Sequence, residues 1–122
     1  MTGPAAGALE GGAPARRVLL DECVPRRLRR AFPRFDVTHV RDAGWAGQRN
    51  GALLRLMLGA GFEVFVTVDR NLEYQQNVAA AGVAVVVLLA RKNRLQELLP
   101  LAPRAAEAIA AAAPGTVARV AG

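Results

Sequence analysis

Two short apolar segments of the sequence each lead into acidic residues. The first spans residues 18–20 and ends in Asp21 and Glu22. The second spans residues 64–68 and ends in Asp69. An apolar run of this length that ends in acid is typical of a buried strand whose carboxyl end carries charge. Ligand sites of open parallel sheets lie beyond the carboxyl ends of the strands, so Asp21 and Asp69 are predicted to meet at one sheet edge.

Asp42 follows a third candidate strand and adds another carboxylate at that edge. Carboxylates that lie within a few ångströms repel each other unless a cation offsets their charge. Mg²⁺ or Mn²⁺ takes oxygen ligands and needs only one or two carboxylates, together with water and a substrate phosphate. Such an ion can orient water and stabilise the charge that develops during phosphodiester hydrolysis. The candidate metal ligands are therefore Asp21, Asp42 and Asp69.

Each acid also has an explanation that involves no catalysis. Asp69 could cap a helix that starts at the next residue by accepting a backbone N–H. Asp42 could be an ordinary turn residue before Gly44. Glu22 points to the opposite side from Asp21 if the strand continues, because side chains alternate along a strand. Asp21 is therefore the member of that pair predicted to face the site, with Glu22 as its neighbour.

Three other residues have side chains that could take part in chemistry, but none is predicted to do so. His39 lies on the core-facing side of an alternating segment and is predicted to be a satisfied buried side chain. Cys23 has no histidine near it in the sequence, so a nucleophilic role is not predicted. Trp45 could stack on a base, but a core anchor explains it better.

Arginines and amides beside these acids are the candidate contacts to a nucleic acid. A short helix after residue 25 places Leu28 and Phe32 toward the core and four arginines toward water, where they could follow a phosphate backbone: Arg26, Arg27, Arg29 and Arg30. The polar run at residues 70–77, which begins with Arg70 and Asn71, could contact phosphate or bases, or could be the exposed side of a helix.

The charge balance agrees with such a partner without proving one. The chain has 16 Lys and Arg against 10 Asp and Glu, a formal net charge of +6, which favours polyanions such as nucleic acid. An arginine-rich and alanine-rich composition is also what a GC-rich genome produces. Composition alone therefore leaves both explanations open.

The hydrophobic pattern predicts how these residues are positioned. With 122 residues, 52% of them hydrophobic, the chain fits one domain with a continuous core. Residues 1–15, rich in Gly, Ala and Pro, are predicted to be a disordered tail, and residues 16–122 the domain. Strands are predicted at 17–21, 35–40, 63–69 and 83–89. Helices are predicted at 25–32, 51–60, 70–81, 93–99 and 103–113. This alternation favours a three-layer α/β/α sandwich around a parallel sheet.

The cellular location is predicted from the cysteine content, the first residues and the length of the apolar runs. The single cysteine, Cys23, cannot form an intramolecular disulfide, and the first residues have no pattern of a secretory signal. The longest apolar run, at residues 78–90, contains Gly82 and is shorter than the roughly 20 residues of a spanning helix. A cytoplasmic protein without a membrane span is expected.

Three segments together resemble a known family. They are Leu-Leu-Asp-Glu at 19–22, Val-Arg-Asp-Ala-Gly-Trp at 40–45, and Val-Thr-Val-Asp-Arg-Asn-Leu at 66–72. In order and spacing these segments resemble the small PIN-like proteins, which are related to the VapC-type toxin ribonucleases. The resemblance covers residues 17–99.

The resemblance implies a PIN-like fold whose acids bind Mg²⁺ or Mn²⁺ and cleave single-stranded RNA. It also implies a small antitoxin protein as a partner and a homodimer. By position, Asp21 and Asp69 match the metal-binding aspartates of the family, and Asp42 matches the acid after the second strand. Many relatives carry an Asp or Glu at the start of the next helix, where this chain has Asn50, although a side-chain carbonyl there could still offer an oxygen.

Three functions are therefore compared. The first is a metal-dependent PIN-like ribonuclease with Asp21, Asp42 and Asp69 in the site and Arg26, Arg70 and Asn71 on the RNA. The second is a nucleic-acid or partner-binding module that has lost catalysis, which Asn50 favours. The third is a receiver-like phosphorylation domain, suggested by the acids and by Lys92, but the switch threonine expected at residues 83–89 is missing.

Overall fold

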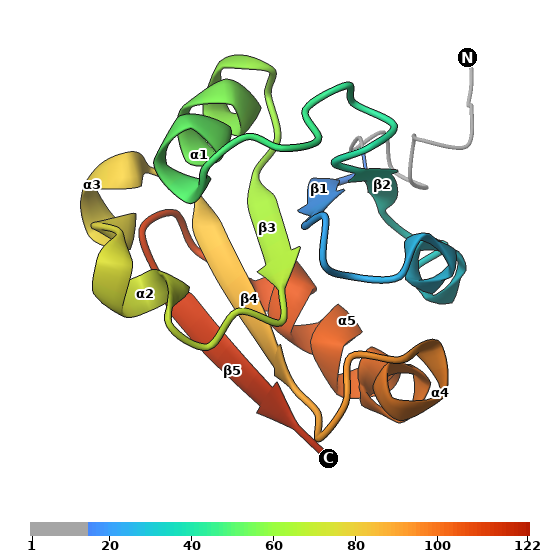
Figure 1. Cartoon of the computed structure of the whole chain (residues 1–122). Helices are drawn as coiled ribbons and strands as arrows, with labels where there is room; N and C mark the ends of the chain where they lie inside the picture. The colour runs from blue at the N-terminus through green and yellow to red at the C-terminus, as the bar shows by residue number, and fades with distance from the viewer. Residues whose placement is uncertain (1–14) are drawn as a thin grey trace.

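A computed structural model describes residues 15–122 of the chain (Figure 1). The predicted disordered tail lies outside the described residues, apart from Ala15, which is buried. The described part contains a five-stranded parallel sheet in the order β2-β1-β3-β4-β5. Its strands are β1 (Arg17–Leu20), β2 (Asp36–His39), β3 (Val64–Thr67), β4 (Ala84–Leu89) and β5 (Val117–Ala121).

The strand order reverses next to β1. From β1 the chain first crosses to β2 on one side, and it then returns to β3 on the other side of β1. Val18 consequently lies opposite both Val37 of β2 and Val64 of β3. This is the order of flavodoxin-like doubly wound sheets, in which ligands bind beyond the carboxyl ends of the two strands that flank the reversal. The acids at the ends of β1 and β3 are thus at the expected position for a site.

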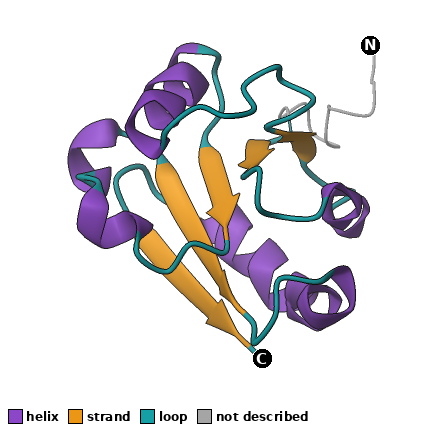
Figure 2. Ribbon diagram, in the orientation of Figure 1, coloured by secondary structure: helices purple, strands orange, loops and turns teal. Residues whose placement is uncertain are grey.

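Helices cover both faces of this sheet (Figures 1 and 2). One face carries the 3₁₀ helices η1 (Arg26–Ala31) and η2 (Leu99–Leu101), with α4 (Leu95–Leu98) and α5 (Ala102–Ala111). The other face carries α1 (Asn50–Gly59), α2 (Leu72–Gln75) and α3 (Val78–Ala81). The predicted three-layer α/β/α sandwich around a parallel sheet is confirmed. Within residues 15–122, no helix is long and apolar enough to cross a membrane.

Side chains alternate between the two faces of the sheet along each strand, and this produces one hydrophobic core on each face. In β1, Val18 and Leu20 pack with Leu28 of η1, whereas Leu19 packs on the opposite face with Met57 of α1. All of these side chains are completely buried. Each such aliphatic side chain removed from water contributes about 1.5–3 kcal/mol. Because both faces of the sheet are covered, β1, β3 and β4 can be almost entirely apolar up to their polar ends.

The predicted single helix at residues 70–81 is wrong. The chain forms α2 and α3 instead, because Gln76 is extended, with φ −125° and ψ 143°. The side chain of Asn77 accepts the backbone N–H of Ala80 and caps α3. Gly82 ends α3 in the left-handed conformation, with φ 78°, as its position after the apolar stretch predicts.

Three other elements differ from the prediction in helix type, in length or in being absent from it. The segment after Pro25 forms a 3₁₀ helix where an α-helix was the simpler expectation, yet Leu28 is buried and its neighbouring arginines are exposed, as predicted. The predicted helix at 93–99 is shorter and continues as η2. Strand β5 was not predicted, because only Val117 and Val120 of its five residues are strand formers and alanine is depleted in strands.

Candidate functional site

Asp21 and Asp69 are brought together by the hydroxyl of Thr67. Thr67 ends β3 and is completely buried. Its Oγ1 donates to Oδ2 of Asp21 at 2.7 Å and accepts the backbone N–H of Asp69 at 3.0 Å. The backbone N–H of Asp21 also donates to the carbonyl of Val66 at 2.9 Å, which extends the β1–β3 pairing to the acid itself. The site therefore lies at the reversal of strand order.

Asp21 is a buried carboxylate held by several donors. It is 8% exposed, and its Oδ1 accepts the backbone N–H of Glu22 at 2.8 Å. Its Oδ2 accepts from Thr67 and, at 3.4 Å, from Sγ of Cys23. A buried carboxylate is tolerated when such donors replace water. Two oxygens offer about four lone-pair positions, so one position remains for a cation.

Asp69 is more accessible and less fully bonded. Its Oδ1 accepts the backbone N–H of Asn71 at 2.9 Å, so it does bind a backbone group just before α2, as the capping explanation supposed. The N-cap of α2 is Asn71 itself, without a side-chain bond. Oδ2 of Asp69 faces only Nδ2 of Asn50, at 3.4 Å, which is longer than a normal hydrogen bond. Asp69 therefore keeps acceptor positions that a metal ion or water can use.

Asn50 is the first residue of α1 and points its amide at Asp69. This orientation follows from the hydrogen-bond network, because an amide nitrogen and oxygen are told apart by their partners. Gly51 allows α1 to start close to the α2–α3 junction, since a Cβ there would come within 3.2 Å of Oε1 of Gln76. Asn50 thus occupies the place predicted for an acid and contributes no negative charge.

Asp42 is not part of this cluster. It lies in a turn after β2, where its backbone N–H donates to the carbonyl of His39 at 2.9 Å, as the turn explanation supposed. Its carboxylate forms an ion pair with Arg26 instead of bonding to Asp21 or Asp69. Within residues 15–122 the structure contains no group of three His, Cys, Asp or Glu side chains that could hold a metal ion. The candidate metal ligands that Thr67 connects are Asp21 and Asp69.

Glu22 binds a loop that lies beside the site. Its Oε1 accepts the backbone N–H of Gly47 at 2.8 Å. Gly47 has φ 85°, a conformation that favours glycine. Glu22 therefore connects the end of β1 to the connection between β2 and α1. Because β1 ends at Leu20 and Glu22 lies in a turn, strand alternation does not determine its direction.

Cys23 is held as a thiol. Its pKa is raised to about 11, first by burial and then by the charge of Asp21. A thiol with this pKa is protonated at neutral pH, and only the thiolate is a strong nucleophile. The surroundings of Cys23 thus agree with the prediction that it has no nucleophilic role.

His39 and Trp45 have the structural roles predicted for them. His39 is 1% exposed, its Nε2 contacts the carbonyl of Val24 at 2.7 Å, and its Nδ1 accepts the N–H of Arg41 at 3.1 Å. Both ring nitrogens are therefore satisfied, with the proton assigned to Nε2. Trp45 packs edge-on against Phe62, with ring centroids 5.8 Å apart. It anchors the loop to the core on the α1 side of the sheet.

The predicted nucleic-acid contacts divide into two groups. Arg26 lines a cavity of about 330 Å³ together with its arginine neighbours and Asp42. Arg70 instead donates from Nη2 to the carbonyl of Ala90 at 3.1 Å, at the end of β4. Asn71 is exposed beside Asp69. Asn71 therefore lies beside Asp69, whereas Arg26 lies beside Asp42.

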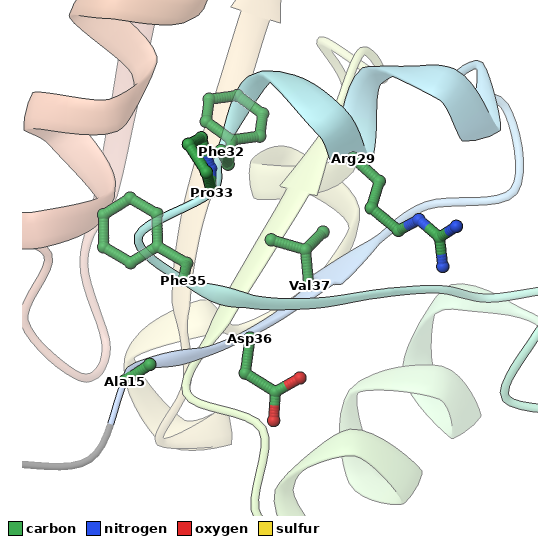
Figure 3. A pocket seen from close by; sticks show the side chains of 7 residues that line it. All are labelled: Ala15, Arg29, Phe32, Pro33, Phe35, Asp36 and Val37. Atoms are coloured by element: carbon green, nitrogen blue, oxygen red, sulfur yellow. The ribbon is translucent and has the colours of Figure 1, made fainter. Parts of the chain in front are cut away.

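A second cavity, of about 400 Å³, lies beside η1 and β2 (Figure 3). It is lined by Ala15, Arg29, Phe32, Pro33, Phe35, Asp36 and Val37. Asp36 and Ala15 lie at the amino-terminal ends of β2 and β1, away from Asp21 and Asp69. In Figure 3, Arg29 extends from η1 on the far side of Val37 from Phe35. This cavity contains none of the predicted metal ligands, and Arg29 is the candidate nucleic-acid contact that lines it.

Thr67 is the site residue that sequence reasoning missed. The signal was present, because Thr67 is the one polar side chain inside the apolar run that leads to Asp69. A polar group in a buried strand needs a partner, and here both partners belong to the site.

Comparison of the chain with protein-family models, curated proteins and solved structures found no match.

Proposed function

We propose that the protein is a metal-dependent PIN-like ribonuclease that hydrolyses phosphodiester bonds in single-stranded RNA. The observation that carries this proposal is the pairing of Asp21 with Asp69 through Thr67 where the strand order reverses. The resemblance of three sequence segments to PIN-like proteins supplies the substrate class. The excess of basic residues supports an anionic substrate.

The residues present fit a Mg²⁺ or Mn²⁺ ion. Mg²⁺ is commonly held by one or two carboxylates and keeps waters and substrate phosphate oxygens as its other ligands. Asp21 and Asp69 would hold the ion, since each retains an acceptor position after its protein hydrogen bonds are made. When bound, the ion would supply positive charge for the phosphate and a lower pKa for water.

The remaining groups of the chain have separate roles in the proposed reaction. In hydrolysis a water oxygen bonds to phosphorus, the bond from phosphorus to the leaving oxygen breaks, and that oxygen takes a proton. Asp69, the more accessible acid, is placed to orient the attacking water. Thr67 fixes the carboxylate of Asp21 through its 2.7 Å hydrogen bond. Asn50 donates its amide toward Asp69 and so limits the rotation of that carboxylate.

Asp42 has a different role in this proposal from the one its position in the sequence suggested. It was predicted to be a third ligand or a group that orients water. Because its carboxylate is paired with Arg26, it instead holds that arginine beside the site. A two-carboxylate centre binds metal more weakly than a centre with more acids, because fewer charged ligands face the cation.

Cleavage of a labelled single-stranded RNA in the presence and absence of Mg²⁺ or Mn²⁺ tests the proposal. Asp21→Asn and Asp69→Asn should each abolish metal-dependent cleavage. Asp36→Asn is the matched control, since Asp36 lies at the opposite sheet edge and pairs with Arg17 at 3.6 Å. Cleavage that persists in the Asp21 and Asp69 variants would refute the proposed site.

A second candidate is a nucleic-acid-binding module that has lost catalysis. The contact between Asn50 and Asp69 favours it, because an amide stands where the resemblance implies a further acid. This candidate predicts RNA binding that is weakened by salt but unaffected by chelators or by Asp69→Asn. RNA cleavage that requires divalent metal would rule it out.

A further inference from the structure

The 3₁₀ geometry of η1 gathers four arginines around one cavity. A 3₁₀ helix has three residues per turn, so side chains three positions apart lie directly above one another. Arg26 therefore lies in line with Arg29, and Arg27 with Arg30, while Leu28 is turned into the core and is completely buried. An α-helix would spread the same residues over a wider arc. Together with Asp42, the four arginines line a cavity of about 330 Å³.

The charges of this cavity are mostly uncompensated. Arg26 is paired with Asp42. Among residues 15–122, the guanidinium groups of Arg27, Arg29 and Arg30 have no ion pair or hydrogen-bond partner. The sequence contains no acid between Glu22 and Asp36. Three guanidinium groups without a counter-ion among the described residues line one cavity, and their like charges favour an anion there.

We propose that the cavity formed by Arg26, Arg27, Arg29 and Arg30 binds a phosphomonoester, the terminal phosphate of a nucleotide or of a nucleic-acid strand. A phosphomonoester carries a charge of about −1.5 to −2 and three acceptor oxygens, which matches several guanidinium groups better than the single charge of a phosphodiester. Arginine binds phosphate through two parallel hydrogen bonds, so a few side chains can surround one group.

The neighbouring cavity leaves room for the organic part of such a ligand. Arg29 lines both cavities, and the second one also presents Phe35 and Pro33 (Figure 3). Apolar and aromatic walls beside a charged pocket suit a nucleoside, because a base can pack on them while its phosphate stays on the arginines. A nucleoside monophosphate is therefore expected to bind more tightly than inorganic phosphate.

This proposal does not depend on cleavage or on a metal. The arginine cavity is built from η1 and the turn after β2, whereas the proposed metal ligands follow β1 and β3. Binding is therefore measured in the presence of a chelator. The full chain is titrated with inorganic phosphate, adenosine 5′-monophosphate and adenosine while backbone amide chemical shifts are followed by nuclear magnetic resonance.

Saturable shifts at residues 26–31 and 42 with both phosphates, and none with adenosine, are expected. The double variant Arg29→Gln/Arg30→Gln should raise both dissociation constants at least about tenfold, because it removes two charge-assisted donors. The matched control Arg55→Gln/Arg104→Gln removes the same charge from arginines that line neither cavity and should leave both dissociation constants within about twofold. Circular dichroism establishes that both variants are folded.

Three results would overturn the proposal. One is the absence of saturable shifts at residues 26–31 with either phosphate. Another is an equal loss of affinity in the two double variants, which would mean that net charge alone attracts phosphate. The third is equal affinity for the two phosphates, which would identify free phosphate and not a phosphomonoester as the ligand. Tighter binding of the mononucleotide would support the proposal.

Discussion

At the scale of single residues, the site depends on a hydroxyl between two acids. Thr67 satisfies an oxygen of buried Asp21 and the backbone of Asp69 at once, at 2.7 Å and 3.0 Å. A carboxylate that is only 8% exposed needs its donors, since an unsatisfied buried charge is costly. Thr67 is therefore a positioning residue, whereas the acids are the groups proposed to contact metal and substrate.

Replacing Thr67 with valine should separate these roles. Thr67→Val keeps the shape of the side chain but removes the donor to Asp21, so the free energy of unfolding should fall by about 1–3 kcal/mol. Metal-dependent cleavage should fall as well, because the carboxylate of Asp21 is freer to rotate. Urea denaturation measures the first effect. Thr38→Val, in β2, is the control, and equal stability of the two variants would contradict the role given to Thr67.

The pH dependence of Cys23 alkylation should reveal the effect of the charge of Asp21. Alkylation of Cys23 by iodoacetamide should be slow at pH 8 and should rise steeply only toward pH 11, since the thiol pKa is about 11. Because the folded-state pKa is above the ordinary thiol value of 9.0, the stability linked to it is complete below pH 9 and is lost as the pH rises toward 11.

The rate profile of Asp21→Asn should shift to lower pH. The midpoint of this profile should remain above pH 9. Burial, which the substitution leaves in place, is the larger cause of the raised pKa, and Asp21 is the second. A profile that is identical in the two proteins would mean that Asp21 does not act on the thiol.

At the scale of elements, the candidate site residues follow the carboxyl ends of strands β1 and β3. The apolar runs that lead to Asp21 and Asp69 could be recognised from the sequence, because a covered parallel sheet needs continuous apolar strands. The arginine cavity could not, because it depends on η1 being a 3₁₀ helix, and no residue pattern at 26–31 separates that from an α-helix. Strand β5 escaped prediction because its pairing with β4 stabilises it more than its own composition does.

The loop between β2 and α1 should loosen when its bond to Glu22 is lost. Glu22→Ala removes the acceptor of the Gly47 amide, which lies 2.8 Å from Oε1, so that amide should exchange with solvent faster. Glu22→Gln keeps an oxygen acceptor and should restore most of the protection. Hydrogen exchange followed by nuclear magnetic resonance measures both. Unchanged exchange at Gly47 in Glu22→Ala would show that the loop is held by Trp45 alone.

At the scale of the whole molecule, the strand order allows more than one function. Flavodoxin-like sheets in the order 2-1-3-4-5 serve unrelated chemistries, so the fold does not choose among them. The receiver-like alternative also needs a hydroxyl on the strand that follows Asp69, and β4, with the sequence Ala-Val-Val-Val-Leu-Leu, has none. The choice between a nuclease and a binding module therefore depends on the acids and on how positive charge is distributed.

Salt dependence can separate a directed phosphate contact from the general attraction of a chain with net charge +6. For single-stranded nucleic acid, each neutralised phosphate charge contributes about −0.7 to the slope of log K against log salt concentration. Arg29→Gln/Arg30→Gln should therefore reduce the steepness of the slope for a 5′-phosphorylated single-stranded RNA by about 1.4, twice the contribution of one contact. Fluorescence anisotropy in a chelator measures it without cleavage.

The control Arg55→Gln/Arg104→Gln distinguishes the two explanations. It makes the same change in net charge, so an attraction that depended on composition alone would reduce the slope equally in both variants. A reduction confined to Arg29→Gln/Arg30→Gln would place the terminal phosphate on η1. The RNA would then be held by one group of residues and cleaved by another, and each could be removed without the other.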